Sequence, residues 1–382
     1  MNLDAILRAE LAALEKADLR RVLCATDGPS GKLLNFAAND YLGLSRHPAL
    51  IEAARAATAQ HGAGAGSSRL ITGTDTAVLA LEEQLAAWKE TEAALMFGSG
   101  YAAALGTIPA LAGKDDTVIL DKLVHASLID AARLSGATVR VFPHNRMEKL
   151  EALLQKVSSA PGRGRILVVT ESIFSMDGDA APLREMAALK EKYGAWLMVD
   201  EAHATGLYGK NRRGLAEELG VGGRIEVQMG TLGKALGAGG GYICGSRTLI
   251  DLLVNRARSF IFSTAPVPAA AAAATAGVRF VQSREGEARR KLLWSRVGHL
   301  QPKIKNQKSK IPAAIIPVMI GDEKKAVELA AALGEHGIFV PAIRYPTVAR
   351  GHARLRVTLT AAHSSEDILQ LTGALKTLGV RL

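Results

Sequence analysis

The chain reads Gly230-Thr231-Leu232-Gly233-Lys234-Ala235-Leu236-Gly237 in the stretch from which its fold class follows. Here Lys234 lies in a glycine-rich turn, and Thr231 precedes it. Glycine lets a backbone approach a ligand closely because it has no side chain. Upstream, the apolar run at residues 196–199 ends on Asp200, where a carboxylate is costly unless it is paired. Both features predict side chains that contact a bound group.

Lys234 and Asp200 together predict a site for pyridoxal phosphate (PLP). A lysine amine can form a Schiff base with the aldehyde of PLP, and an aspartate can keep its pyridine nitrogen protonated. Thr231 can donate to the phosphate, and His203 can reach the phenolic oxygen. His125 opens a predicted helix and could stack on the ring, although a lone histidine is more often structural. Taken singly, Lys234 would be a surface lysine and Asp200 a salt-bridge partner.

A phosphate cradle is predicted in Gly98-Ser99-Gly100-Tyr101-Ala102-Ala103, which follows a strand and opens a helix. Because the N–H groups at a helix N-terminus bind phosphate, we expect Ser99, Gly100 and Tyr101 to hold the phosphate of PLP. The stretch also fits the G-x-G-x-x-[GA] pattern of dinucleotide sites, which is weak on its own. A plain turn between a strand and a helix is the remaining alternative.

The stretch Asp200-Glu201-Ala202-His203 also spells the DEAH box of nucleic-acid-dependent ATPases. Such an enzyme needs a phosphate loop of the form G-x-x-x-x-G-K-[ST]. The four Gly-Lys pairs of the chain are followed by Leu33, Asp115, Asn211 and Ala235, never by serine or threonine. A DEAH-type ATPase therefore stays only a remote alternative.

Composition indicates an ordinary globular protein. Hydrophobic residues make up 48% of the 382 residues and charged residues 22%. The net charge of +10 is more simply explained by dispersed arginines than by nucleic acid. Cys24 and Cys244 form no metal or disulfide pattern, which fits a reducing compartment. With neither a signal peptide nor a membrane span predicted, we expect a cytoplasmic protein without metal, membrane or nucleic-acid partners.

Apolar runs and helical patterns alternate from about residue 76. Continuous apolar strands separated by helices are typical of a mostly parallel sheet covered on both faces, with functional residues at the carboxyl ends of its strands. We expect strands at 93–97, 117–120, 138–142, 166–170 and 196–200, and helices at 101–111, 125–134, 146–157 and 183–193.

The predicted domains are an N-terminal helix and extended segment (1–45), a large α/β domain (46–284) and a small α+β domain (285–382). In the last we expect strands at 313–320 and 354–360, an extended run at 338–343, and helices at 323–337 and 364–378.

Six motifs carry a family resemblance over nearly the whole chain. They are NFAANDYLGL (35–44), GAGSSR (64–69), TESIFSMDG (170–178), VDEAH (199–203), GTLGK (230–234) and RLRVTLTAAH (354–363). On these motifs the chain resembles the α-oxoamine synthases, which are fold-type I PLP-dependent transferases. The resemblance implies a decarboxylative condensation of L-alanine with pimeloyl-CoA, or pimeloyl-carrier-protein, in biotin biosynthesis. Members of the family that use glycine remain an alternative.

The resemblance also implies roles for particular residues. Lys234 would remove the α-proton, Ser175 would contact the phenolic oxygen of PLP, and His125 would assist the condensation. The amino acid's carboxylate would be held by Asn39 and Arg344, since arginine offers a bidentate fork, and Arg20 would contact the distal carboxylate of the acyl chain. A homodimer with an interfacial active site is implied as well, with Ser263 and Thr264 reaching the partner's phosphate.

Overall fold

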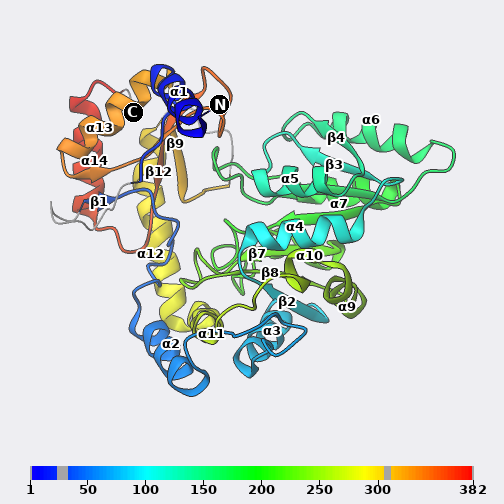
Figure 1. Ribbon diagram of the computed structural model, residues 1–382. Coiled ribbons are helices and arrows are strands. Elements are labelled where there is room, and N and C mark those ends of the chain that lie inside the picture. Colours follow the sequence, from blue (N-terminus) through cyan, green and yellow to red (C-terminus); the bar gives the residue numbers. More distant parts are fainter. Residues whose placement is uncertain (1, 24–32, 305–310, 381–382) are drawn as a thin grey trace. The chain divides into compact units, whose positions relative to one another are not determined.

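The computed structural model describes residues 2–23, 33–304 and 311–380, so that Cys24 lies outside the described residues. By its internal contacts the chain divides into two units, whose elements are labelled in Figure 1. The large unit consists of Leu42–Ser175 and Ala180–Lys291. The small unit consists of Met1–Tyr41, Met176–Asp179 and Leu292–Leu382.

The large unit is built on a seven-stranded sheet in the order β2-β8-β7-β6-β5-β3-β4. The strands from β7 to β4 are parallel, whereas β8 pairs antiparallel with both β7 and β2. This order confirms the predicted α/β fold with a mostly parallel central sheet. The strands are β2 (Ala93–Phe97), β3 (Thr117–Asp121), β4 (Thr138–Phe142), β5 (Ile166–Glu171), β6 (Trp196–Asp200), β7 (Val227–Thr231) and β8 (Gly241–Gly245).

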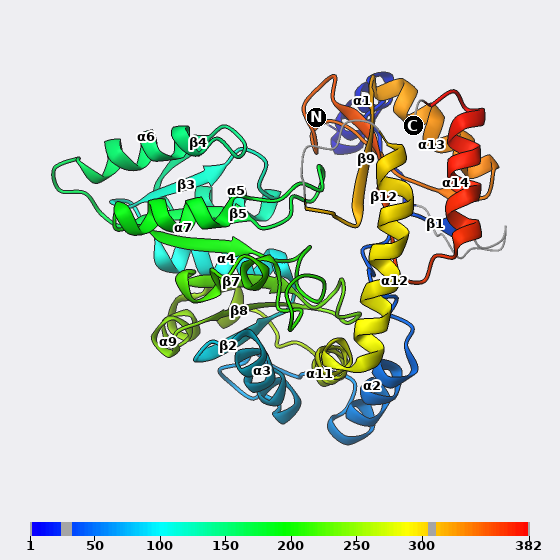
Figure 2. The same cartoon turned by 180° about the vertical axis from the view of Figure 1, so that it is seen from behind.

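Helices cover both faces of this sheet, and Figures 1 and 2 show α4 and α7 on opposite sides of it. For this reason every residue of β5 is buried, which explains its continuous apolar sequence. The helices are α2 (Pro48–His61), α3 (Thr76–Lys89), α4 (Gly100–Leu111), α5 (Ala126–Leu134), α6 (Met147–Ser158), α7 (Leu183–Lys192), α8 (Leu215–Glu218), α9 (Arg247–Arg256), α10 (Arg258–Ile261) and α11 (Pro268–Gln282). Helix α12 (Arg284–Leu300) runs from this unit into the small one.

The carboxyl ends of the parallel strands bring the polar residues together. Strand β5 ends on Glu171, β6 on Asp200 and β7 on Thr231. Glu171 and Asp200 are register partners in neighbouring strands. Because parallel strands end at the same edge of a sheet, chain segments far apart in sequence deliver these side chains to one place.

The small unit contains a three-stranded antiparallel sheet in the order β11-β12-β9 and a short parallel pair of β1 with β10. Its elements are α1 (Leu3–Lys16), β1 (Leu34–Asn35), β9 (Ile315–Gly321), α13 (Glu323–Glu335), β10 (Ile338–Phe339), β11 (Ala342–Ile343), β12 (Ala353–Thr358) and α14 (Ser365–Thr377). The run expected at 338–343 forms two strands in different sheets. Pro341 lies between them and has no N–H to continue a ladder.

The segment Met176–Asp179 belongs to the small unit although its neighbours in sequence do not. The guanidinium of Arg354 lies 3.1 Å from the Asp177 carboxylate and donates to the carbonyl of Met176. Gly178 has a φ of 68°, and a side chain there would overlap the Ile315 carbonyl. This segment follows directly on Ser175 of the large unit.

Candidate active site

Lys234 lies in the turn that joins β7 to β8, and its amine is directed at His203. The distance from Lys234 Nζ to His203 Nε2 is 2.9 Å. His203 is 6% exposed, whereas Lys234 is half-buried. The turn packs tightly, since Gly237 has a φ of 66° and an added Cβ would lie 2.5 Å from that of Leu44. The amine is therefore held by a close-packed turn beside a buried imidazole.

Asp200 is a buried carboxylate at the end of β6, with an exposed fraction of 5%. Its Oδ1 accepts a hydrogen bond of 2.9 Å from the N–H of Ala202. Burial raises the pKa of Asp200, while the ammonium of Lys234, the Ala202 N–H and His125 act in the opposite direction. A protonated ring nitrogen of a ligand would supply the cation that keeps this carboxylate ionised.

Glu171 follows a predicted strand directly, at the carboxyl end where functional residues are expected, but it is not among the predicted cofactor-binding residues. It is 2% exposed, and its Oε2 accepts from the Ser175 N–H at 3.2 Å. Its Oε1 has no hydrogen-bond partner among the described residues. Burial, followed by the charge of Asp200, raises the pKa of Glu171 to about 8. A signal for it existed in the sequence, because Glu171 also ends an apolar strand.

His125 is the N-cap of α5 and is fixed by that role. Its Nδ1 accepts from the N–H of Ser127 at 3.2 Å and lies 2.8 Å from the Ser127 hydroxyl. Burial lowers the pKa of His125, which favours a neutral ring, although Asp200 acts against this. The imidazole is thus oriented by its own helix, and the negative charge of Asp200 favours its protonated form.

The predicted phosphate cradle forms the N-terminus of α4. Ser99 is the N-cap, and its Oγ accepts from the N–H of Ala102 at 3.0 Å. Strand β8 approaches closely, since a Cβ on Gly241 would lie 2.5 Å from the Gly100 nitrogen. The Thr231 Cβ lies 3.9 Å from a Cβ built on Gly100, which places the threonine beside the cradle. Tyr101 contributes its backbone here, because its hydroxyl donates to Asp130 at 2.6 Å.

These residues fit PLP. The described residues offer an amine for a Schiff base, a buried carboxylate for the ring nitrogen, and a helix N-terminus for the phosphate. The buried Oε1 of Glu171, which has no hydrogen-bond partner by distance and angle among the described residues, is a further polar atom that a bound group could contact. Ser175 is 6% exposed and joined to this cluster through Glu171. By contrast, Ser263 and Thr264 are exposed, and Thr264 forms an isolated bridge with Ser68.

The three predicted substrate contacts all lie in the small unit. Asn39 Oδ1 accepts from the guanidinium of Arg356 at 3.1 Å. Arg344 donates from Nε to the carbonyl of Asp18 at 2.6 Å and from Nη2 to that of Arg20 at 2.7 Å. The Arg20 side chain forms an exposed ion pair of 2.7 Å with Glu15. The fork of Arg344 is thus occupied by main-chain carbonyls in this structure.

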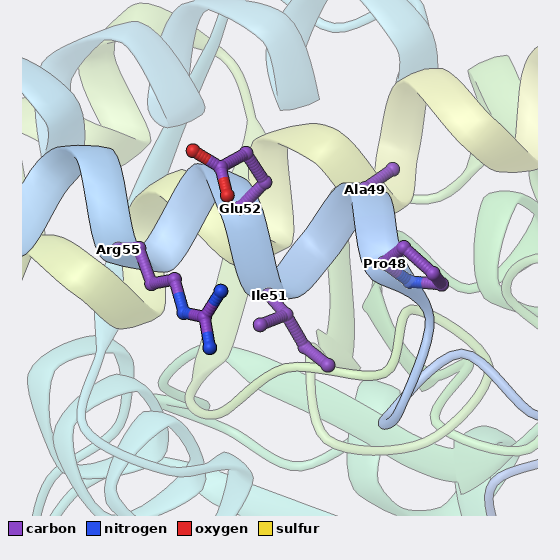
Figure 3. Close-up of a pocket in the computed structure, with 5 residues that line it drawn as sticks. All are labelled: Pro48, Ala49, Ile51, Glu52 and Arg55. Carbon is purple, nitrogen blue, oxygen red and sulfur yellow. The ribbon is translucent and has the colours of Figure 1, made fainter.

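A surface hollow on the large unit contains none of the predicted site residues. It is lined by five residues of α2, namely Pro48, Ala49, Ile51, Glu52 and Arg55 (Figure 3). None of them is a predicted site residue. Within the described ranges, no cluster of His, Cys, Asp or Glu is arranged to hold a metal ion. No helix in those ranges is both long enough and apolar enough to cross a membrane.

Comparisons with known proteins identify the family of the chain. A family model described as aminotransferase class I and II matches residues 31–375. An 8-amino-7-oxononanoate synthase of Geobacter sulfurreducens is 44% identical over 387 residues, which cover 98% of each chain. The enzyme of that name from Anaeromyxobacter sp. (strain Fw109-5) is 50% identical over 96% of this chain and 94% of its own length.

Solved structures of related enzymes have the same fold. A serine palmitoyltransferase variant of S. paucimobilis, solved with a bound PLP–myriocin aldimine, superposes with a TM-score of 0.91 at 30% identity over 100% of both chains. An 8-amino-7-oxononanoate synthase of Francisella tularensis superposes with a TM-score of 0.76 at 26% identity, over 91% of this chain and 98% of the other.

Proposed function

The chain belongs to the aminotransferase class I and II family and groups with its 8-amino-7-oxononanoate synthases, and from this premise we propose that it condenses L-alanine with a pimeloyl thioester. It is a PLP-dependent acyltransferase of fold type I. The products would be 8-amino-7-oxononanoate, CO2 and CoA, or the free carrier protein if that delivers the acyl group.

One observation carries this proposal: Lys234 Nζ lies 2.9 Å from Nε2 of His203. His203 follows three residues after Asp200, so the amine lies beside the segment that holds the buried carboxylate. When bound, PLP withdraws electrons from the α-carbon of the amino acid. Asp200 would hold the ring nitrogen protonated. Lys234 would bind the cofactor and, once released, take the α-proton, with His203 fixing the amine. His125 would cover one face of the ring.

The phosphate of PLP would be held at the N-terminus of α4, by the N–H groups of Gly100 and Tyr101 and by Ser99. Thr231 would add its hydroxyl, which at present donates to the Gly240 carbonyl at 3.0 Å. In a homodimer the exposed Ser263 and Thr264 would contribute to the partner's phosphate site. Their exposure leaves them available for this role.

The substrate would be recognised by residues of the small unit. Arg344 and Asn39 would bind the carboxylate of L-alanine. The guanidinium of Arg344 would then have to release the two main-chain carbonyls to which it donates and donate to the two carboxylate oxygens instead. Arg20 would contact the distal carboxylate of the pimeloyl chain. We place the protein in the cytoplasm, where amino acids and CoA thioesters are available.

The test is thiol release by the purified PLP-loaded protein. L-Alanine, glycine and L-serine would each be combined with pimeloyl-, acetyl-, succinyl- and palmitoyl-CoA. We expect release only with L-alanine and pimeloyl-CoA, and none from the Lys234→Ala variant. Release with glycine and a short acyl-CoA, or with L-serine and palmitoyl-CoA, would keep the family and reject the proposed substrates.

A further inference from the structure

A buried ionic cluster lies next to the candidate active site and is used by none of the steps above. Lys89, the last residue of α3, has its Nζ 3.6 Å from the Oε2 of Glu201. Both side chains are only 1% exposed. Glu201 follows Asp200 directly in the sequence. A full ion pair is therefore buried one residue from the carboxylate that would hold the cofactor's ring nitrogen.

Lys89 also anchors the residues that follow His203. Its Nζ donates to the hydroxyl of Thr205 at 2.9 Å and to the carbonyl of Arg213. The Thr205 hydroxyl in turn lies 2.9 Å from that of Tyr242 on β8. Lys89 Nζ is 5.6 Å from the centroid of the Tyr242 ring. One ammonium thus joins α3, the segment 200–205, the loop before α8, and β8.

Glu201 has no freedom to move away from this cluster. Its Oε1 accepts from the N–H of Ala216 at 2.9 Å, and its own N–H donates to the Met229 carbonyl at 2.8 Å. Gly214 has a φ of 137°, and any side chain there would overlap Glu201 Oε2. Burial raises the pKa of Glu201, and the ammonium of Lys89 acts against that rise.

Stability alone is a poor explanation for such a pair. The cost of removing two charges from water can exceed their attraction, so an uncharged pair of similar shape is often as stable. The large unit contains a second ion pair, Lys190–Glu226, that can serve as a control because it lies away from the candidate active site. Lys190 Nζ lies 2.6 Å from Glu226, whose other oxygen accepts from the Leu197 N–H near the start of β6. Lys190 is buried in this pair, whereas the Glu226 side chain is 38% exposed. That pair lies at the opposite end of the strand that carries Asp200.

We propose that Lys89 is a positioning residue of the active site. By holding Glu201 and Thr205 at fixed places, it fixes the segment 200–205 that carries Asp200 and His203. This inference rests on the proposed function. The buried pair would set the angle between Asp200 and the cofactor ring. The effect can be large, since an error of about 1 Å in such a contact can cost roughly a hundredfold in rate.

The experiment compares the uncharged double variant Lys89→Met/Glu201→Gln with the control Lys190→Met/Glu226→Gln. Urea midpoints of the apoproteins would report folding. The visible circular dichroism of bound PLP would report the orientation of the cofactor ring without any substrate. Turnover of L-alanine with pimeloyl-CoA would be separated into kcat and KM.

We expect both double variants to keep a urea midpoint close to that of the natural chain. Only Lys89→Met/Glu201→Gln should change the dichroism of bound PLP and lower kcat by about tenfold or more, with KM for the amino acid little changed. The single variant Lys89→Met should also lower the urea midpoint, because it leaves Glu201 buried without its partner, and adding Glu201→Gln should restore that midpoint but not kcat.

Unchanged dichroism and kcat in Lys89→Met/Glu201→Gln would overturn the inference, as would equal losses in the control pair. If Lys89→Met/Glu201→Gln fails to fold while the control folds, the pair is structural and the inference is also wrong. Failure of the proposed function would look different, since the natural chain would then bind PLP but release no thiol from L-alanine with pimeloyl-CoA.

Discussion

At the scale of single residues, Asp200 has the simplest expected effect. Asp200→Asn removes the charge that would keep the ring nitrogen of PLP protonated and preserves the shape of the side chain. We expect turnover to fall about a hundredfold or more, the size typical for loss of one stabilising electrostatic contact, while PLP still binds through Lys234. Steady-state kinetics with spectroscopic measurement of bound PLP would check this.

The matched control is Asp116→Asn, which changes another buried carboxylate, paired with Arg165 at 2.8 Å before the start of β3. That variant should lose some stability and keep kcat. Equal losses of kcat in the two variants would show that Asp200 acts only through folding.

Glu171 makes the stability of the large unit depend on pH. Its pKa rises to about 8 in the folded protein, through burial and the charge of Asp200, so the folded state binds its proton more tightly than the unfolded state. The contribution of Glu171 is then full below its ordinary pKa and is lost as the pH rises through about 8. The ammonium of Lys234 and the backbone N–H groups of His125 and Ser175 act against this rise in the pKa of Glu171.

The variant Glu171→Gln keeps the shape and removes the titration. From pH 5 to pH 8 the free energy of unfolding of the natural apoprotein should fall relative to that of the variant, by at most about 1.4 kcal/mol per pH unit. Urea unfolding at three pH values measures the difference. Parallel curves for the two proteins would contradict the prediction.

Single residues at strand ends could be predicted from the sequence, whereas the contacts between residues on different strands and helices could not. Asp200 and Lys234 were found because a charge after an apolar run and a lysine among glycines are visible locally. Glu171 has the same signal, but its importance follows from its register with Asp200, which is a contact between strands. Lys89 has no local signal, because burial of its amine depends on Glu201, over a hundred residues away.

At the scale of elements, two helix caps differ in what they should affect. Ser99 caps α4 at the predicted phosphate site, and Ser364 caps α14 through a capping box with Asp367. Replacing either serine by alanine should lower the free energy of unfolding by about 1 kcal/mol. Only Ser99→Ala should also weaken PLP binding, by several-fold. Equal affinities in the two variants, measured by titration with PLP, would remove Ser99 from the cradle.

Element limits were predicted well where burial is continuous and less well where proline intervenes. Strands β2, β4 and β6 have the expected bounds, and β5 extends one residue further, to Glu171. The run expected at 338–343 is divided at Pro341, which periodicity does not reveal. Strands β7 and β8 were not predicted as a pair, because the glycines that make them part of the site also weaken their β signal.

At the scale of the whole molecule, the net charge of +10 should favour the anionic thioester. A basic protein attracts a polyanion over distances that salt screens, and CoA carries several negative charges while L-alanine is neutral overall. Raising the ionic strength should therefore raise KM for pimeloyl-CoA several-fold and leave KM for L-alanine nearly unchanged. Equal salt effects on both substrates would indicate that the positive charge is dispersed away from the site.

The fold class followed from the alternation of strands and helices and from the motifs, and the comparisons confirm it. The domain limits at residues 45 and 284 stay a prediction. What sequence could not supply is the assignment of Met176–Asp179 to the small unit, since it depends on the contacts of Arg354 and on the space left by Gly178.

The antiparallel placement of β8 has a consequence for the order in which the molecule assembles. Only nine residues separate the paired Thr231 and Gly241, so the loop that carries Lys234 closes a hairpin. Hairpins join residues that are near in sequence and form quickly, whereas the pairing of β8 with β2 closes a loop of well over a hundred residues. We expect the reactive amine to reach its turn early in refolding, and the helix that cradles the phosphate to join it only when β2 docks.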